Sequence, residues 1–203
     1  MKLESETKCK LLRVGMQLIW ENSYGSVSVD DICKRAEVKK GSFYHFFPSK
    51  SDLVVAALEA DWQRKRVYLD QYFSPQTPPL ERIEQFFRGG FKAQQEKSQE
   101  CGKVCGCPTL TLGAELSTQD ENIRLKTVEI MDRYVRYLES AIADAIREGV
   151  VESGDPRTLA LGLFAYFQGL LLQAKVRNDL TPLHIVQSGM LSLLGCDRAV
   201  TTV

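Results

Sequence analysis

The segment from residue 27 to residue 53, VSVDDICKRAEVKKGSFYHFFPSKSDL, constrains the fold of this chain more than any other part of it. Ser28 stands three residues before Asp31, and Ser49 stands three residues before Asp52. A hydroxyl followed at this interval by a carboxylate is typical of a helix start. Apolar residues at helical spacing follow the first start, so one face of a short helix is expected to be buried. They are Val29, Ile32, Cys33 and Ala36.

A second short helix is expected between these two starts. Glu37-Val38 is predicted to form the turn before it, the run KKGS at residues 39–42 opens it, and Pro48 ends it. Two short helices joined by a tight turn are typical of the helix-turn-helix, whose second helix enters the major groove of DNA. The lysines, glycine and hydroxyl that open the second helix suit that role. The segment therefore predicts a DNA-reading head.

Residues 8–58 also resemble the DNA-binding head of the TetR-family transcriptional regulators. The string KKGSFYHFFPSKSDL carries most of this resemblance and is far more specific than a bare helix-turn-helix pattern. The rest of the chain resembles the family in length, in helicity and in the pair Gly106-Cys107. The other matching residues in the head are Leu12, Gly15, Leu18, Ile19, Tyr24, Gly25, Ser28, Val29, Ile32, Ala36 and Val38.

Helical periodicity without strand signals predicts an all-α fold. We expect an N-terminal three-helix helix-turn-helix head over residues 1–48 and a larger C-terminal helical domain, for ligand binding and dimerisation, over residues 49–203. Gly25 suits a left-handed cap after the first helix. The helices are expected over about 7–23, 29–36, 40–47, 50–73, 79–98, 108–116, 118–148 and 156–178, with a last one from 181.

Composition favours a cytoplasmic protein. No apolar run approaches the roughly 18 residues that span a bilayer, and the N-terminus lacks the apolar core of a secretory signal. The six cysteines are therefore expected as thiols. The net charge is zero, but residues 1–50 hold nine lysines and arginines against six acidic residues. A mildly basic head suits a protein that docks one end onto phosphate.

The predicted DNA contacts gather around the second helix of the motif. Its lysines reach phosphate or a guanine edge, its glycine lets the backbone approach DNA, and its hydroxyl meets a base or a phosphate. The resemblance implies that Tyr44 and Lys50 contact phosphate. The N-terminus of the preceding helix, at Ser28 and Val29, faces the DNA backbone. The predicted set is Ser28, Val29, Lys39, Lys40, Gly41, Ser42, Tyr44, His45 and Lys50.

The expected partners are a double-stranded operator, a second copy of the chain and a small-molecule inducer. A homodimer places two heads on a palindrome, in successive major grooves about 34 Å apart. The resemblance implies that the last two helices pair between subunits as a four-helix bundle. For each candidate in this bundle, a place in the internal core is the alternative. The candidates are Phe164, Phe167, Leu171, Met190 and Leu194.

The inducer is expected among the middle helices, where aromatic residues are numerous. Gln168 is a polar amide in an otherwise apolar helix, so it suits the orientation of a ligand, although a buried amide with satisfied hydrogen bonds is the alternative. For the aromatic residues, the alternative is core packing. The predicted ligand-binding residues are Trp62, Phe87, Phe91, Cys107, Tyr134, Phe164 and Gln168.

Three thiols stand close together at Cys101, Cys105 and Cys107. They allow three interpretations: a redox or electrophile sensor, a soft-metal site, or a buried Cys107 beside two incidental thiols in the loop. The spacing differs from that of zinc ribbons, and the two histidines, His45 and His184, lie elsewhere, so no metal and no cofactor are expected. A thiol enzyme is a further rival, but the chain has no C-x-x-C pair and no strand pattern. We therefore expect no enzyme.

These observations predict a ligand- or redox-responsive transcriptional repressor that an inducer releases from its operator. A transcriptional activator of the same fold is one alternative, and a thiol-based electrophile sensor that uses residues 101–107 is another. A third is a helical adaptor that has kept the shape of the head and lost DNA binding. Salt-dependent retention on duplex DNA separates the last from a regulator, because phosphate contacts weaken steeply with salt.

Overall fold

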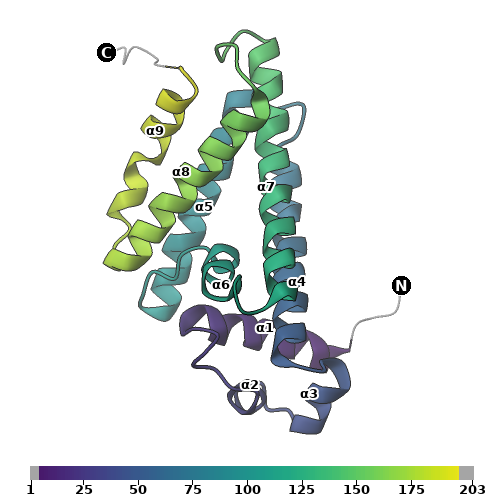
Figure 1. Cartoon of the computed structure of the whole chain (residues 1–203). Coiled ribbons are helices and arrows are strands. Elements are labelled where there is room, and N and C mark those ends of the chain that lie inside the picture. The colour runs from purple at the N-terminus through teal and green to yellow at the C-terminus, as the bar shows by residue number, and fades with distance from the viewer. Residues whose placement is uncertain (1–4, 197–203) are drawn as a thin grey trace. The chain divides into compact units, whose positions relative to one another are not determined.

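The computed structural model describes residues 5–196, and within that range the chain is helical, without strands (Figure 1). The predicted all-α fold is confirmed. Most elements lie within a few residues of the positions expected from periodicity and caps. The elements are α1 (Glu6–Glu21), α2 (Val29–Ala36), α3 (Lys40–Phe46), α4 (Lys50–Tyr72), α5 (Pro79–Cys101), α6 (Pro108–Leu116), α7 (Glu121–Arg147), α8 (Pro156–Arg177), the 3-10 helix η1 (Thr181–Ile185) and α9 (Val186–Leu193).

The chain divides into two compact units. The first, here the head unit, extends to Lys65 and includes Pro108–Ile130; the second, here the body unit, comprises Arg66–Cys107 and the chain from Met131 onward. Helices α4 and α7 therefore contribute residues to both units. The predicted division after residue 48 stays a prediction.

The head unit is built on side chains that its three short helices bury together. Phe43 and Phe47 are 0% and 3% exposed, while Phe46 is half-buried. Gly15 of α1 lies against Leu53 of α4 so closely that an added Cβ would stand 2.6 Å from the leucine Cδ2. A glycine is therefore needed where these two helices meet. The α1 residues on the buried face are Leu11, Leu12, Val14, Gly15, Met16 and Ile19.

Both predicted helix starts in the head are confirmed. The Ser28 hydroxyl accepts a hydrogen bond from the Asp31 N–H at 3.1 Å, while the Asp31 carboxylate accepts one from the Ser28 N–H at 2.9 Å, which completes a capping box. The Ser49 hydroxyl likewise accepts from the Asp52 N–H at 3.1 Å. Helix α2 then ends at Glu37, in the left-handed region with φ 54°.

Two details of the predicted helix ends are wrong. Gly25 is not among the residues with positive φ, because α1 ends earlier: the backbone N–H and the side-chain amide of Asn22 both donate to the Leu18 carbonyl, which leaves no need for a left-handed glycine. Helix α5 continues to Cys101, three residues beyond the expected end, and Gly102 terminates it with φ 70°.

The last helix also differs from the prediction. It begins as the 3-10 turn η1 and becomes α-helical only at Val186. Asp179 accepts hydrogen bonds from both the N–H and the hydroxyl of Thr181, and Pro182 follows at the start of η1. Proline has no N–H to donate, so a tight turn at a helix start tolerates it well.

The body unit has an aromatic core. Phe167 of α8 lies 5.8 Å from Phe86 and 5.1 Å from Phe87, centroid to centroid, and an added Cβ on Gly90 would stand 2.5 Å from the Phe167 ring. Glycine at position 90 therefore admits the ring between α5 and α8. The five residues predicted as candidates for an intersubunit bundle are all buried within the single chain: Phe164, Phe167, Leu171, Met190 and Leu194.

Helix α8 is long and apolar enough to meet a simple criterion for a membrane span. An 18-residue window in it has a mean hydropathy of 1.4, so by length and composition alone this helix is apolar enough to cross a bilayer. Gln168 and small residues interrupt the large apolar side chains of this helix, so it contains no uninterrupted apolar run of about 18 residues. Within the chain, 44% of the window is buried, and the core helices of globular proteins pass the same test. The feature is therefore weak evidence for a membrane span.

Candidate functional site

Helix α3 presents one buried face and one exposed polar face. Phe43 is fully buried, whereas Tyr44 is 49% exposed and His45 is exposed as well. Lys39 is the N-cap residue, without a side-chain capping bond, and it is exposed together with Lys40, while Ser42 is half-exposed. Most of the side chains predicted to reach DNA from this helix thus lie on its open side.

Gly41 lies in the first turn of this open side. A Cβ built there meets nothing within 4 Å, and its φ is not positive, so neither packing nor backbone conformation requires glycine. What glycine provides is a bare stretch of helix backbone. A surface of this kind allows close approach of another backbone, as major-groove docking demands.

Lys40 is paired within the head. Its Nζ lies 2.8 Å from the Asp30 carboxylate of α2, and both side chains are more than half exposed. The hydrogen bond and the negative charge of Asp30 raise the pKa of Lys40. Asp30 was missed by sequence reasoning, because a contact between residues on two different helices leaves no periodic signal. A DNA phosphate that approached Lys40 would compete with this carboxylate.

The start of α2 already carries a negative charge. Hydrogen bonds from Ser28 lower the pKa of Asp31, so this carboxylate is ionised where the sequence placed a DNA phosphate. Val29 follows at the first turn and is half-exposed. The predicted phosphate contact at Ser28 and Val29 stays a prediction.

Lys50 ties the start of α4 to the loop between α1 and α2. Its Nζ donates to the carbonyls of Tyr24 and Val27 at 2.8 and 2.7 Å, and it lies 3.8 Å from the centroid of the Tyr24 ring. Burial lowers the pKa of Lys50, although the nearby charge of Glu115 opposes this. The phosphate contact implied for Lys50 stays a prediction, and it would require an exchange of these carbonyl partners.

A second tie to the same loop comes from α6. The Glu115 carboxylate accepts hydrogen bonds from the N–H groups of Tyr24 and Gly25 at 3.2 and 3.1 Å. Residues ninety positions apart are thus joined within the head unit. Any movement of α6 relative to this loop breaks a charge-assisted pair of hydrogen bonds. No sequence pattern indicates this contact.

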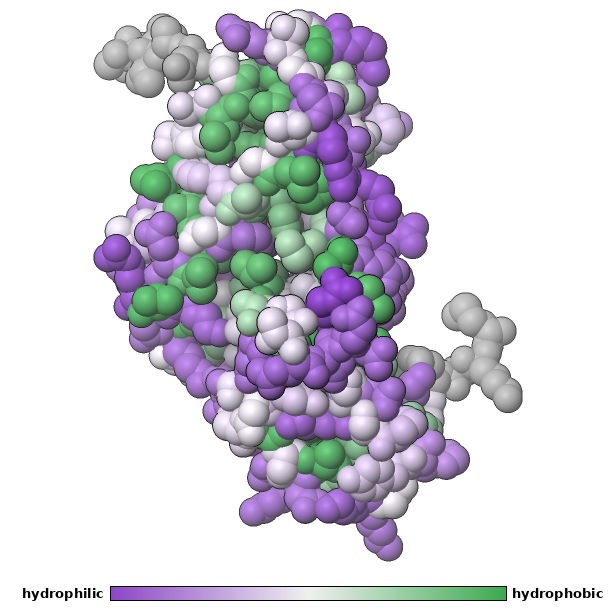
Figure 2. Space-filling view, in the orientation of Figure 1, coloured by the Kyte–Doolittle hydropathy of each residue, from purple (hydrophilic) through white to green (hydrophobic). Residues whose placement is uncertain are grey.

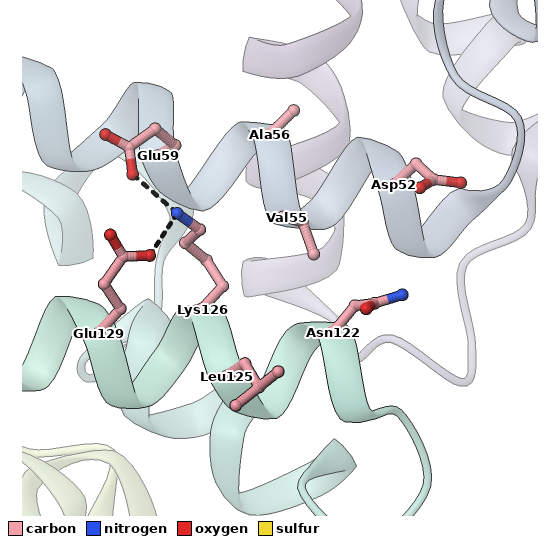
Figure 3. A pocket seen from close by; sticks show the side chains of 8 residues that line it. All are labelled: Asp52, Val55, Ala56, Glu59, Asn122, Leu125, Lys126 and Glu129. Atoms are coloured by element: carbon pink, nitrogen blue, oxygen red, sulfur yellow. Dashed lines mark hydrogen bonds and ion pairs between the residues drawn. The ribbon is translucent and has the colours of Figure 1, made fainter.

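A groove opens on the head unit between α4 and α7 (Figure 3). It has a volume of about 580 Å³. The Lys126 ammonium bridges Glu59 of α4 and Glu129 of α7 at 3.1 and 2.6 Å, and so closes one side of the groove. None of the residues predicted to bind a ligand lines it. The lining residues are Asp52, Val55, Ala56, Glu59, Asn122, Leu125, Lys126 and Glu129.

The structure brings three of the predicted ligand residues into one aromatic cluster of the body unit. Tyr134 and Phe164 stack at 5.8 Å, and Phe87 joins them through Phe86, which lies 5.3 Å from Phe87 and 6.0 Å from Tyr134. Phe91 instead faces His184 edge-on at 5.6 Å. Trp62 belongs to the head unit, where it is 4% exposed.

The remaining two candidates differ in chemistry. Gln168 is 8% exposed, and its Oε1 finds no hydrogen-bond partner among the described residues. A buried acceptor without a donor costs about 1–3 kcal/mol of folding stability, and a bound molecule that donates a hydrogen bond to Oε1 would remove this cost. Cys107 precedes α6 and is half-exposed. Across residues 5–196, no group of three or more His, Cys, Asp and Glu side chains is placed to hold a metal ion.

Two family models match this chain. The model for bacterial regulatory proteins of the tetR family matches residues 11–57, and the model for the tetracyclin repressor-like C-terminal domain matches residues 79–190. The first covers the capped helices and the exposed face of α3, and the second covers most of the body unit. The chain belongs to the TetR family of bacterial regulatory proteins, and it is a DNA-binding transcriptional regulator.

Similar proteins support this assignment along most of the chain. The HTH-type transcriptional repressor NemR of Escherichia coli K12 is 32% identical over 190 residues, which are 89% of this chain and 90% of the relative. The transcriptional regulator AcuR of Cereibacter sphaeroides is 31% identical over 176 residues, 86% of this chain and 78% of the relative. Several relatives are thus named as regulators or repressors.

Solved structures share the fold. The reduced form of NemR from E. coli superposes with a TM-score of 0.80 at 27% identity and covers 93% of this chain and 98% of its own. The regulatory protein TetR from Rhodobacter sphaeroides gives 0.81 at 30% identity, with 92% and 97% covered. The similarity therefore extends over head and body alike.

Proposed function

We propose that this chain is a cytoplasmic homodimeric repressor that binds a palindromic operator through α3 and leaves it when a small molecule binds in the body unit. The exposed face of α3 carries the proposal. Lysines and open backbone at its start stand over a fully buried Phe43. The side chains that reach DNA are those predicted from the sequence, with Lys39, Lys40 and Tyr44 leading.

The proposed dimer uses the exposed side of α8 and α9, since the five residues named at first are core. Gly162, Ala165 and Gly169 follow one another at helical spacing and are exposed or half-exposed. Small residues in such a row let a second helix approach closely. Figure 2 shows green apolar side chains over α8 and α9. The large apolar residues exposed on these elements and η1 are Leu161, Leu172, Val176, Ile185 and Leu193.

The proposed inducer lies beside Gln168 and the aromatic cluster. An amphipathic molecule with a hydrogen-bond donor would satisfy the Gln168 Oε1, which has no partner among the described residues, and would bury its apolar part against rings such as Phe164. Helices α4 and α7 contribute residues to both units, so they are two of the covalent connections by which a change in the body can reach the head. A coupling of about 1–3 kcal/mol changes operator affinity ~5–150-fold.

The test is a titration of labelled promoter DNA with purified protein across salt concentrations. The proposal expects one dimer on each palindrome, and affinity that falls as salt rises, because each phosphate contact releases counterions. A matched fragment with a scrambled palindrome is the control. Equal affinity for both fragments, or retention indifferent to salt, would contradict the proposal.

A thiol-based sensor remains the second candidate function. The favouring observation is that the sulfurs of Cys101 and Cys105 lie 3.4 Å apart.

A further inference from the structure

The loop between α5 and α6 brings two thiols into contact. Cys101 is the last residue of α5, and the left-handed Gly102 turns the chain back at once. Cys105 follows in the loop, and its Sγ lies 3.4 Å from the Cys101 Sγ. Cys105 is 3% exposed, whereas Cys101 is half-exposed. Cys101 is thus the more accessible residue of the pair, and Cys105 is buried beside it.

Two buried or capping amides hold this loop in place. The Asn178 Oδ1 accepts a hydrogen bond from the Val104 N–H at 2.8 Å, and Asn178 is also the left-handed cap that ends α8. The Gln94 side chain donates to the Gly106 carbonyl and accepts from the Gly106 N–H, both at 3.1 Å. The residues on either side of Cys105 are therefore fixed, so the sulfur contact is built into the loop.

We propose that Cys101 and Cys105 form a redox site that a hydroperoxide converts into an intrachain disulfide, and that this change adjusts the regulator's hold on DNA. The Cys101 thiolate, being the more exposed, attacks the peroxide oxygen, so the O–O bond breaks, a sulfenic acid forms and the peroxide leaves as hydroxide or alkoxide. The Cys105 thiol then attacks that sulfur and expels water. Two thiols are oxidised to one disulfide while the peroxide is reduced to water, or to water and an alcohol.

Closure must distort the loop. A disulfide brings its sulfurs to about 2.0 Å, so the pair has to move roughly 1.4 Å closer together. Val104 and Gly106 flank Cys105, and their backbone groups hold the Asn178 and Gln94 side chains. The movement therefore strains the hydrogen bonds to Asn178, at the C-terminal end of α8, and to Gln94, within α5. Both helices belong to the body unit, where the inducer is proposed to bind.

Burial and the neighbouring Cys101 raise the pKa of the Cys105 thiol to about 11. This suits the second partner of the reaction. At neutral pH, Cys105 stays protonated behind Cys101 and attacks only after the sulfenic acid has formed. The closing step should therefore accelerate as pH rises toward that value, because the thiolate is the nucleophile.

The first experiment treats the reduced full-length protein with one equivalent of hydrogen peroxide and follows intact mass and peptide maps. The expected product has lost two hydrogen atoms and contains a peptide pair linked through Cys101 and Cys105. Cys105→Ser should stop at a sulfenic acid on Cys101 that dimedone traps, and Cys105→Ala repeats this arm with a different side chain. Cys9→Ser, which removes an exposed thiol from α1, should form the disulfide between Cys101 and Cys105 as the parent does. A linkage between other cysteines, or no such product, would overturn the site.

The second experiment measures operator affinity before and after oxidation, and this part rests on the proposed function. Oxidation should change the affinity of the parent several-fold, reversibly with a dithiol reductant, and should leave Cys101→Ser unchanged. A parent that forms the disulfide but binds the operator as before would reject the regulatory role. If the reduced parent failed to bind its operator at all, the proposed function would fail instead, and the mass measurement would still decide the chemistry.

Discussion

The head and the body of this chain hold their functional groups by different means. In the head, a helix of seven residues is set by caps and turns that lie within a few positions of it, so its exposed face follows from local sequence. In the body, the candidate functional groups are held in place by contacts between residues that are distant in sequence, such as Val104 and Asn178. A DNA reader can therefore be recognised from a short string, whereas an effector site has to be built from the fold.

The largest expected change in operator affinity comes from loss of the dimer, which tests whether the body unit binds a second subunit. Leu172→Arg places a charge on the exposed side of α8, where Leu172 is 55% exposed. Loss of the dimer should lower operator affinity roughly 10²–10⁴-fold, since two linked heads bind more tightly than one. Sedimentation and operator titration measure the two changes together. Leu125→Arg, at a leucine that is 52% exposed on α7, is the control and should remain dimeric. A dimeric Leu172→Arg would reject the proposed interface.

The next effect isolates the head. Lys40→Ala should weaken operator binding roughly tenfold and reduce the salt slope by about 1, because one phosphate contact is lost. Its effect should be similar on all operator sequences if the contact is to phosphate, and should depend on the base if Lys40 reads a guanine edge. Lys92→Ala, an exposed lysine of α5, should change neither quantity. An unaltered salt slope in Lys40→Ala would remove this residue from the interface.

Two buried amides of the body offer a matched pair. Gln168→Leu should raise the free energy of unfolding by about 1 kcal/mol, because it removes a buried acceptor without a partner. Gln94→Leu should lower it by about 1–3 kcal/mol, because it removes the two buried hydrogen bonds that the Gln94 side chain makes with the Gly106 backbone. Chemical denaturation of both variants checks the signs. Destabilisation by Gln168→Leu would show that this amide is a structural group and would weaken the proposed ligand site.

The smallest effect refines the picture of the head. Asp30→Asn should raise operator affinity about two- to fivefold, because it frees Lys40 from an exposed ion pair and so lets the lysine reach phosphate. The gain should shrink as salt rises. The double variant with Lys40→Ala should show almost no gain from the asparagine. An equal gain in both backgrounds would mean that Asp30 acts on DNA directly and not through Lys40.

The sequence predicted those parts of the structure whose causes are local. The capping pairs at Ser28 and Ser49 predicted two helix starts, and the helix expected over 156–178 matches α8. Contacts between distant residues were missed: Asp30 with Lys40, and Glu115 with the Tyr24 loop. Nothing in a linear pattern records which side chains a fold brings together.

The same reason explains why the sequence left two interpretations open for the apolar residues of the body. Phe164 and Met190 look like an apolar face that needs a partner, but the chain covers them itself, and the open side of α8 carries Gly162 and Gly169 instead. Helical spacing shows which residues share a face. It does not show whether another segment of the chain or a second subunit covers that face.

The exposed face of α3 is expected to enter a DNA groove. Retention of the chain's own promoter fragment at low ionic strength tests it most directly, with the parent compared against the double variant Lys40→Glu, Tyr44→Ala. Both positions are exposed, so the variant should keep the helical content and thermal stability of the parent. We expect the parent to bind the fragment and the folded variant to leave it unbound. Equal retention of the two proteins would contradict it.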